Sequence, residues 1–357
     1  MTPHLLFAIT PHGFGHAAMA APVINALREQ YPAWNFTLRT MVAPEFLSCR
    51  IKQPYKLQRV ADDFGMVQRN ALEVDVEASA RRYREMHRNW DEAVERVAEE
   101  LRAARVDLVV ADVPYLTLAA AQRAGIPNIA LCCLHWGDIY AHYCLERPEG
   151  ALIHGQIMSA YRGADRFIRT EPAMPMAALD NLQTVGPIAS RGRNRRAEHD
   201  ARLALQPGER LVLVAMGGIA FRLPMEQWPV IRGVRFIVQR DWQVARDDCV
   251  DLESLGMSFT DLLASSDLML TKPGYGSFSE AAVNGTPVLY VPRPDWPESP
   301  WLIHWLEQNS HCAAIERELV ERGELTAAIE TLLRRGRPTP VKPSGVLQAV
   351  AAIEAML

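Results

Sequence analysis

The chain has 357 residues, a length that suits two domains of ordinary size better than one. Its formal net charge of -4 gives no overall basic field that would attract nucleic acid, and no apolar run reaches the ~20 residues that a membrane span needs. The six cysteines form no CxxC pair and no Cys/His cluster with zinc-ligand spacing, so we expect reduced and mostly buried thiols and no metal. The first residues lack a basic leader and a cleavage site, which makes the cytoplasm the expected compartment.

The first half of the sequence alternates predicted strands and helices. An apolar run at residues 5–9 leads into a glycine-bearing turn and a segment with helical spacing, which is the opening of a doubly wound α/β unit. A second strand is expected at 35–39. Residues 76–104 carry dense charge on one face and apolar residues at helical spacing, which predicts one long helix or two in tandem. The apolar run at 107–111, a helix, and a strand within 128–134 give a Rossmann-like βαβαβ order.

The second half begins after a break in this pattern. Residues 185–210 contain a Gly-Pro pair, a basic run and few apolar residues, which predicts an interdomain linker. A second α/β unit begins at Leu211, and its further strands are expected at 234–239, 267–271 and 287–292. The last segment, 345–357, is apolar on one face and predicts a helix that packs back across the linker or on the first domain.

These elements predict an α/β protein with two Rossmann-like, doubly wound domains that face a central cleft. We expect the domains to cover residues 1–186 and 187–357. Ligands of open α/β sheets collect at the carboxyl ends of the strands, so the turns that follow strands are the expected sites of function.

The first such turn contains His12, Gly13, Gly15 and His16 and lies where a strand ends and a helix begins. Glycine lets the backbone approach a ligand closely, and the helix N-terminus offers free N–H groups. His16 would then lie at the mouth of the cleft, where an imidazole can act as a base. A glycine turn with a histidine near the helix start is an equally good interpretation of this motif alone.

Asp112 follows a buried strand at the same expected edge of the sheet. A carboxylate at this place can orient His16 and stabilise its charged form, as in a base–orienter pair. The alternative is that Asp112 caps the next helix, which aspartate does well. Taken alone, the motif favours the cap.

Gly217 and Gly218 follow the first strand of the second half. Small residues at such a turn suit a diphosphate that rests on backbone amides. A βα turn that simply needs glycine is about equally well supported.

The fourth motif runs from Lys272 to Ala282 and is the most specific of the set. After a strand, the amides of Gly276 and Ser277 are placed to hold phosphate, and Glu280 to accept hydrogen bonds from ribose hydroxyls. Glu280 is expected in the first turn of the next helix. A capping box between Ser277 and Glu280 is the alternative. It leaves the paired glycines, Gly274 and Gly276, unexplained, so we expect these residues to converge with Gly217 and Gly218 on one pocket.

The fourth motif and its surroundings, DLLASSDLMLTKPGYGSFSEAAVNGTPVLYVP, resemble the donor-binding region of glycosyltransferases with the B-type fold. These include the UDP-glycosyltransferases and the peptidoglycan enzyme that adds N-acetylglucosamine to lipid I. The leading TPHGFGH resembles the first glycine loop of the same enzymes. The resemblance implies the GT-B fold, a UDP-sugar as donor, an acceptor hydroxyl and no cofactor.

A closer resemblance is to the glycosyltransferase-like N-terminal region of plant arabinose kinases and its stand-alone bacterial relatives. It is carried by the HGFGHA start, by residues 63–68 (DFGMVQ), by residues 135–141 (HWGDIYA) and by the GYGSFSEA turn. It covers almost the whole chain but includes no kinase part, so it does not imply sugar kinase activity.

The sequence departs from the UDP-glycosyltransferases at two places. Their donor loop often begins with His, where this chain has Lys272, and their Asp-Gln pair near the donor sugar is represented only by Asp295. The resemblance therefore implies a donor site that includes Lys272 and Asp295, and it leaves the identity of the donor open.

Three functions compete at this point. The leading interpretation is an inverting, metal-independent transfer of a sugar from a nucleoside diphosphate to an acceptor hydroxyl, with His16 as the base and Asp112 as its orienter. A non-catalytic nucleotide-sugar binding or sensor protein would use the same cleft, and a nucleotide-sugar epimerase can share the architecture. A contact between His16 and Asp112 favours transfer, whereas a His16 turned into the core favours the binding protein.

Overall fold

The computed structural model describes residues 2–219 and 221–357 and divides into two compact units. The N-terminal unit comprises the chain up to residue 69, residues 73–188 and residues 344–357. The C-terminal unit comprises residues 70–72 and 189–343. Both units are built on parallel sheets with helical crossovers, as the alternating pattern of the sequence predicts.

The N-terminal unit contains a seven-stranded sheet in the order β3-β2-β1-β6-β7-β8-β9. Its central strands are buried almost throughout and mostly apolar because helices cover both faces. The strands, all in parallel pairs, are β1 (His4–Ile9), β2 (Asn35–Arg39), β3 (Lys56–Gln58), β6 (Leu108–Asp112), β7 (Asn128–Cys132), β8 (Arg166–Thr170) and β9 (Leu182–Val185). A separate ribbon pairs β4 (Gln68–Asn70) with β5 (Glu73–Val74).

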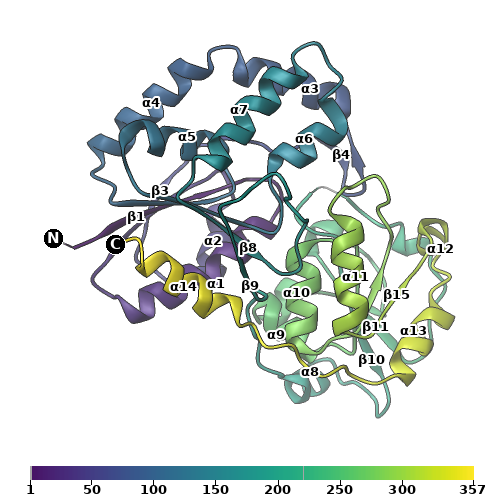
Figure 1. Ribbon diagram of the computed structural model, residues 1–357. Coiled ribbons are helices and arrows are strands. Elements are labelled where there is room, and N and C mark those ends of the chain that lie inside the picture. The colour runs from purple at the N-terminus through teal and green to yellow at the C-terminus, as the bar shows by residue number, and fades with distance from the viewer. Residues whose placement is uncertain (1, 220) are drawn as a thin grey trace. The chain divides into compact units, whose positions relative to one another are not determined.

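Helices lie on both sides of this sheet (Figure 1). Those drawn above it are α3 (Val76–His87), α4 (Trp90–Ala103), α5 (Tyr115–Ala124), α6 (Trp136–Cys144) and α7 (Gly150–Arg162), and those below it are α1 (Gly15–Gln30), α2 (Pro44–Arg50) and α14 (Gly345–Glu354). The charged segment 76–104 thus forms two tandem helices. Asp75 caps the first of them by accepting a hydrogen bond from the amide of Ala78.

The C-terminal helix α14 returns to the N-terminal unit and packs on α1. Its first residue, Gly345, lies so close to the chain after β9 that a Cβ there would come within 1.9 Å of the Gly186 carbonyl oxygen. The amide of Gly345 donates to the Pro187 carbonyl, and the Gln348 side chain accepts from the Gly186 amide. Backbone contact of this closeness is available only to glycine and fixes the start of the helix.

The C-terminal unit contains a six-stranded parallel sheet in the order β12-β11-β10-β13-β14-β15. The strands are β10 (Arg210–Ala215), β11 (Val234–Val238), β12 (Cys249–Asp251), β13 (Leu268–Thr271), β14 (Val288–Tyr290) and β15 (Cys312–Ala314). The helices are α8 (Arg196–Arg202), α9 (Phe259–Ser265), α10 (Tyr275–Asn284), α11 (Ser299–Asn309), α12 (Arg317–Arg322) and α13 (Thr326–Arg334), with short 3₁₀ turns at 225–227, 240–242 and 252–255.

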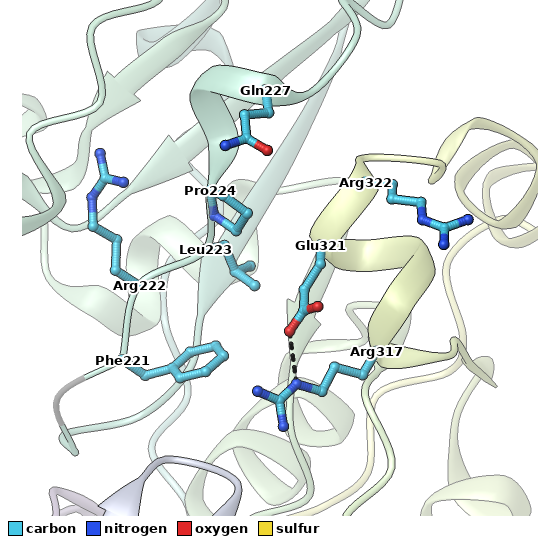
Figure 2. Close-up of a pocket in the computed structure, with 8 residues that line it drawn as sticks. All are labelled: Phe221, Arg222, Leu223, Pro224, Gln227, Arg317, Glu321 and Arg322. Carbon is cyan, nitrogen blue, oxygen red and sulfur yellow. Dashed lines mark hydrogen bonds and ion pairs between the residues drawn. The ribbon is translucent and has the colours of Figure 1, made fainter.

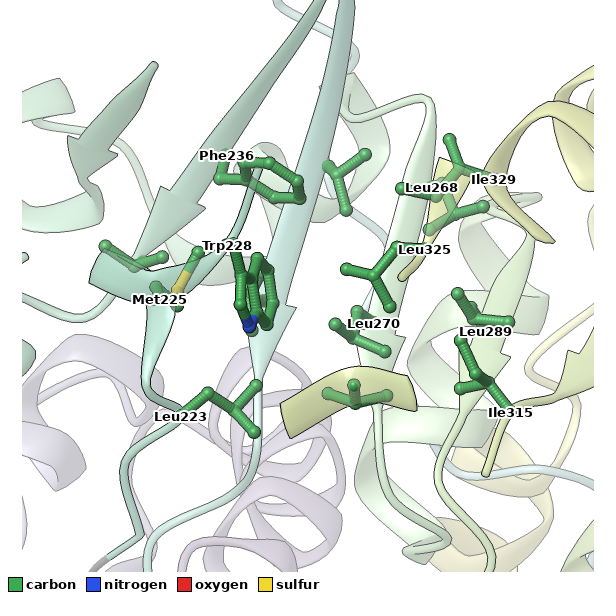
Figure 3. Packing of buried hydrophobic residues seen from close by; sticks show 14 of the residues in the cluster. Leu223, Met225, Trp228, Phe236, Leu268, Leu270, Leu289, Ile315, Leu325 and Ile329 are labelled. Carbon is green, nitrogen blue, oxygen red and sulfur yellow. The ribbon is translucent and has the colours of Figure 1, made fainter. Parts of the chain in front are cut away.

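One hydrophobic cluster forms the core on one side of this sheet (Figure 3). Trp228 packs edge to face on Phe236, with ring centroids 5.4 Å apart, and both are buried among leucines of β13 and β14. Gly323, at φ +72°, ends α12 directly against the Trp228 ring. The apolar strands predicted from the sequence therefore each contribute to a packed core.

Several elements were not predicted from the sequence. The expected linker 185–210 contains α8, and seven strands (β3, β4, β5, β8, β9, β12 and β15) were missed. Five of these strands (β3, β4, β5, β12 and β15) have only two or three residues and none fully buried, so they carry no readable periodicity. The expectation of mostly buried thiols is only half right, because Cys49 is exposed and Cys249 and Cys312 are partly exposed.

Among the residues described, no helix is both long and apolar enough to cross a membrane.

The packing of α14 predicts a clear contrast between two positions on that helix. Ile353 is fully buried, whereas Leu347 is 69% exposed. Ile353→Ala should lower the free energy of unfolding by about 2–5 kcal/mol, because it leaves a cavity, and Leu347→Ala should change it by less than about 0.5 kcal/mol. Urea unfolding of the two variants measures this, and equal effects would contradict the packing.

Candidate functional site

The first candidate site lies where β1 and β6 end side by side in the N-terminal unit. Parallel pairing places Ile9 opposite Asp112, the last residues of the two strands. After β1 the chain turns through the glycine loop and enters α1, whose second residue is His16. His16 Nδ1 lies 2.8 Å from Asp112 Oδ1, and both side chains are buried. The structure thus brings together the two residues that the sequence places 96 positions apart.

Asp112 is not the cap of the next helix. That helix, α5, begins at Tyr115 after Pro114, and no side chain caps it. The capping alternative is therefore wrong, because the chain runs on for two residues before the helix starts. The carboxylate points to His16 instead, and its second oxygen, Oδ2, is buried without a hydrogen-bond partner among the described residues.

The His16–Asp112 pair holds one proton tightly. Burial alone would lower the pKa of His16, but the Asp112 carboxylate and the neighbouring Cys132 outweigh it and raise that pKa well above its usual value of 6.5. Burial also raises the pKa of Asp112 well above its usual range, although His16 opposes this. Nδ1 is engaged by the carboxylate, which leaves Nε2 as the nitrogen able to exchange a proton with a ligand.

Cys132 is the third member of this cluster and was not predicted. It is the last residue of β7, the strand next to β6, and its Sγ lies 3.8 Å from His16 Nδ1. Burial would raise the pKa of the thiol, but Cys133 and His16 reverse this and bring it well below its usual value. A signal was present in the sequence, because Cys132 lies near the carboxyl end of the strand predicted within 128–134, at the edge where Asp112 follows another predicted strand.

Two further segments contact Thr10, the residue that follows β1 and precedes the glycine loop. Thr10 Oγ1 donates to Asp63 Oδ2 over 2.5 Å, and the Trp136 indole donates to Thr10 Oγ1 over 3.4 Å. Asp63 and Trp136 belong to the DFGMVQ and HWGDIYA segments that carried the family resemblance. Burial raises the pKa of Asp63 to about 7, an effect that the bond from Thr10 and the charge of His16 reduce but do not cancel.

The glycine loop itself is supported by the same two segments. The His12 ring stands edge-on to the Trp136 ring, with the ring centroids 5.3 Å apart. His12 Nε2 lies 3.3 Å from Nε2 of the Gln68 side chain. Gly13 adopts φ +70°, which favours glycine. Gly15 begins α1 and is exposed, and a Cβ there would meet nothing within 4 Å. The loop is thus closed on the Trp136 side and open at Gly15.

The second candidate site lies in the C-terminal unit, where β10 and β13 end side by side. Lys272 follows β13, and its Nζ would lie 3.8 Å from a Cβ on Gly217 and 3.8 Å from one on Gly274. The ammonium therefore stands between the two predicted glycine turns. Within the part of the chain that the structure describes, it makes no hydrogen bond or ion pair. Burial and the nearby Arg293 cation lower the pKa of Lys272 to about 8, although Glu298 opposes them.

Helix α10 begins earlier than the sequence indicates. Its N-cap is Gly274, so Tyr275, Gly276 and Ser277 form the first turn, and their amides precede the first helical hydrogen bond, from Phe278 to Gly274. Glu280 is therefore in the second turn, and the placement in the first turn is wrong. The capping box between Ser277 and Glu280 is wrong for the same reason.

The remaining predicted donor residues are spread more widely. Glu280 is buried, Gly218 is exposed, and Gly217 adopts φ +86° after β10. The Asp295 side chain is 48% exposed and lies 4.0 Å from Arg293 Nε. The Lys272 side chain thus lies close to both Gly217 and Gly274, whereas Asp295 lies near Arg293.

Arg293 and Glu298 are buried charged residues that the sequence reasoning missed. The Arg293 guanidinium lies over the Trp296 ring, 4.4 Å from its centroid, and donates to the Leu72 carbonyl. Glu298 accepts from the Trp296 indole over 3.0 Å. Both follow β14 in a proline-rich loop, where the sequence shows a charge pattern but nothing that predicts burial.

A separate cavity of about 620 Å³ lies between residues 221–227 and α12 (Figure 2). Three arginines and Phe221 contribute to its walls, and Arg317 is paired with Glu321 across one turn of α12. None of the predicted donor residues is among the eight described residues that line it.

The packing around Gly65 leaves no room for a larger side chain between the glycine loop and Trp136. It adopts φ +67°, and a Cβ there would lie 2.6 Å from the Trp136 ring and 2.9 Å from His12 Nδ1. Gly65→Ala should lower the free energy of unfolding by about 2–4 kcal/mol, from the left-handed backbone and the overpacking together. Gly15→Ala is the matched control and should be nearly neutral, because the site is open. Thermal or urea unfolding measures both, and a neutral Gly65→Ala would contradict the packing.

Comparison with known proteins agrees with the fold. No family model matches the chain. L-arabinokinase of Arabidopsis thaliana is 30% identical over 311 residues, which cover 85% of this chain and 30% of that protein, so the chain spans less than a third of its relative.

Among solved structures, UGT89C1 of Arabidopsis thaliana matches 99% of this chain and 95% of its own with 14% identity and a TM-score of 0.61, and it has also been solved with UDP. CalG4, the calicheamicin glycosyltransferase, matches 100% and 98% with 15% identity and a TM-score of 0.62. The chain therefore has the glycosyltransferase B fold of these solved enzymes, and most of its length is similar in sequence to a part of L-arabinokinase.

Proposed function

We propose that this chain transfers a sugar from a nucleoside diphosphate, a UDP-sugar in the first place, to an acceptor hydroxyl, with inversion and without a metal. The observation that carries the proposal is the buried contact between His16 and Asp112 at the end of β1 and β6. A histidine that is held at Nδ1 by a carboxylate and has Nε2 available is the usual arrangement of a general base.

In this mechanism His16 Nε2 removes the proton of the acceptor hydroxyl. The acceptor oxygen forms a bond to the anomeric carbon on the face opposite the diphosphate, and the bond from that carbon to the phosphate oxygen breaks. The diphosphate leaves with the electron pair, and the imidazolium formed on His16 is stabilised by Asp112 at 2.8 Å. No redox step and no covalent intermediate is needed.

The donor site is assigned to the C-terminal unit. The diphosphate would accept hydrogen bonds from the first-turn amides of Gly276 and Ser277 and an ion pair from Lys272, whose ammonium has no other partner among the described residues. We assign the ribose to Glu280 and the donor sugar to Asp295 on the family resemblance. The UDP complex of UGT89C1 supports a uridine nucleotide as the first ligand to test.

If His16 is the base, its replacement should lower the rate of transfer without weakening donor binding. His16→Ala should reduce transfer by about 10²–10⁴-fold and leave the affinity for the nucleoside diphosphate within about twofold. The exposed His142, in the same unit, supplies a control in His142→Ala, which should transfer at the wild-type rate. Product analysis with and without acceptor is the assay, and a product formed without acceptor would instead indicate an epimerase.

The same pair sets the pH dependence of transfer. A base acts only when it is unprotonated, and Asp112 raises the pKa of His16, so the rate should fall as the pH is lowered through that raised pKa. Asp112→Asn removes the carboxylate. It should move this acid limb to lower pH while it reduces the maximal rate. An unmoved acid limb in Asp112→Asn would remove His16 from the role of base.

The lowered pKa of Lys272 predicts that donor binding depends on pH. Lys272→Met should weaken binding of UDP by about tenfold or more, because a hydrogen bond to a charged group contributes ~1.5–3 kcal/mol. In the wild type, affinity should decline above about pH 8, where Lys272 loses its proton, and this decline should be absent from the variant. Calorimetry at several pH values measures both effects, with the exposed Lys342→Met as control. Equal affinities of the two variants would contradict this donor site.

A further inference from the structure

We propose that His16, Asp112 and Cys132 form a binding site for a zinc-like divalent ion, which would block the imidazole that the glycosyl-transfer proposal uses as its base. The three residues end or follow three strands that are neighbours in one sheet, β1, β6 and β7. Their ligand atoms, one nitrogen, one carboxylate oxygen and one sulfur, all lie within 4.8 Å of one another. Nothing in the sequence spacing predicts such a site, because the residues are 96 and 116 positions apart from His16.

The distances are close to those of a tetrahedral zinc site. Zinc holds a nitrogen at about 2.0–2.1 Å and a thiolate sulfur at about 2.3 Å, which places these two atoms about 3.5 Å apart. His16 Nδ1 and Cys132 Sγ are 3.8 Å apart. The nitrogen and the carboxylate oxygen would be about 3.4 Å apart in such a site and are 2.8 Å apart here, so binding requires them to separate by roughly half an ångström.

Charge balance favours an ion at this place. A neutral imidazole, a carboxylate and a thiolate together carry two negative charges, so a divalent cation would make the buried cluster neutral and remove most of its desolvation penalty. Asp112 Oδ2 is buried and accepts no hydrogen bond among the described residues, so this oxygen has a lone pair available for an ion, while the contact between Oδ1 and His16 Nδ1 is given up on binding. Binding through Nδ1 leaves a neutral imidazole that carries its proton on Nε2. The imidazolium form of His16 would therefore release one proton on binding, the neutral form would move its proton from Nδ1 to Nε2, and the thiol would release its proton where Cys132 is protonated.

The ligand set also selects the kind of ion. Sulfur and imidazole nitrogen favour Zn²⁺ and Cd²⁺ over Mg²⁺, which prefers oxygen ligands. Three protein ligands leave a fourth position for water, as in catalytic zinc sites. His16 is the most exposed of the three side chains and follows Gly15, beside which there is open space, so the fourth position is expected on that side.

Occupation of the site would take His16 Nδ1 away from Asp112 and hold the imidazole on the metal. Transfer by the proposed mechanism would then stop, because the carboxylate no longer stabilises the imidazolium. Binding of the ion does not depend on transfer. The two proposals can therefore fail separately: a chain without transferase activity would still bind the ion.

The test is titration of the full chain with Cd²⁺, followed in the ultraviolet by the thiolate-to-cadmium charge-transfer band. One ion per chain should bind, Zn²⁺ should displace it and Mg²⁺ should not. Cys132→Ser should abolish the band and weaken binding by at least about 100-fold, because even the loss of an outer-shell partner weakens metal sites by 10–100-fold. Cys144→Ser changes an equally buried thiol at the end of α6 and should bind like the wild type.

A band that persists in Cys132→Ser, or no band in the wild type at millimolar Cd²⁺, would overturn the proposal. If Cys132→Ser does not fold, X-ray absorption at the zinc edge of the wild-type protein decides the question. One sulfur at about 2.3 Å with lighter ligands at about 2.0–2.2 Å supports the site. A shell without sulfur, or with several sulfurs, contradicts it.

Discussion

The parallel alignment of β1, β6 and β7 is the constraint on which the N-terminal site depends. Because these strands run in one direction and end at one edge, the residues that follow or end them come together whatever their distance in the sequence. His16, Asp112 and Cys132 meet for this reason. The local helix start and the βα turns then decide only the final orientation of each side chain.

Both candidate sites keep charged or titratable groups out of water, which is unfavourable unless a partner compensates for it. In the N-terminal unit, His16 and Asp112 compensate one another, and Asp63 is held by Thr10. In the C-terminal unit, burial and the nearby Arg293 cation lower the pKa of Lys272 to about 8. Sites of this kind are less stable empty than occupied, so binding of an anion near Lys272 should stabilise the C-terminal unit.

The sequence by itself determined the fold class and most of the candidate positions. The alternation of apolar runs with amphipathic segments predicted two Rossmann-like units, and the glycine turns after strands predicted where ligands bind, because period and glycine content are local properties of the chain. The helical character of residues 76–104, the strand at 35–39 and the last helix follow from the same local signals, whereas the division of 76–104 into two helices does not. Three-residue edge strands such as β15 carry too little pattern to be found in this way.

Only the tertiary structure decided how these residues are used. It assigned Asp112 to His16 rather than to a helix cap, added Cys132 and Asp63, and moved Glu280 into the second turn of α10. The physical reason is that a side chain's partner depends on which strands are neighbours in the sheet and where a helix actually starts. Burial acts in the same way: it gives Asp63 and Lys272 pKa values that no sequence pattern contains, because they arise from the surrounding packing.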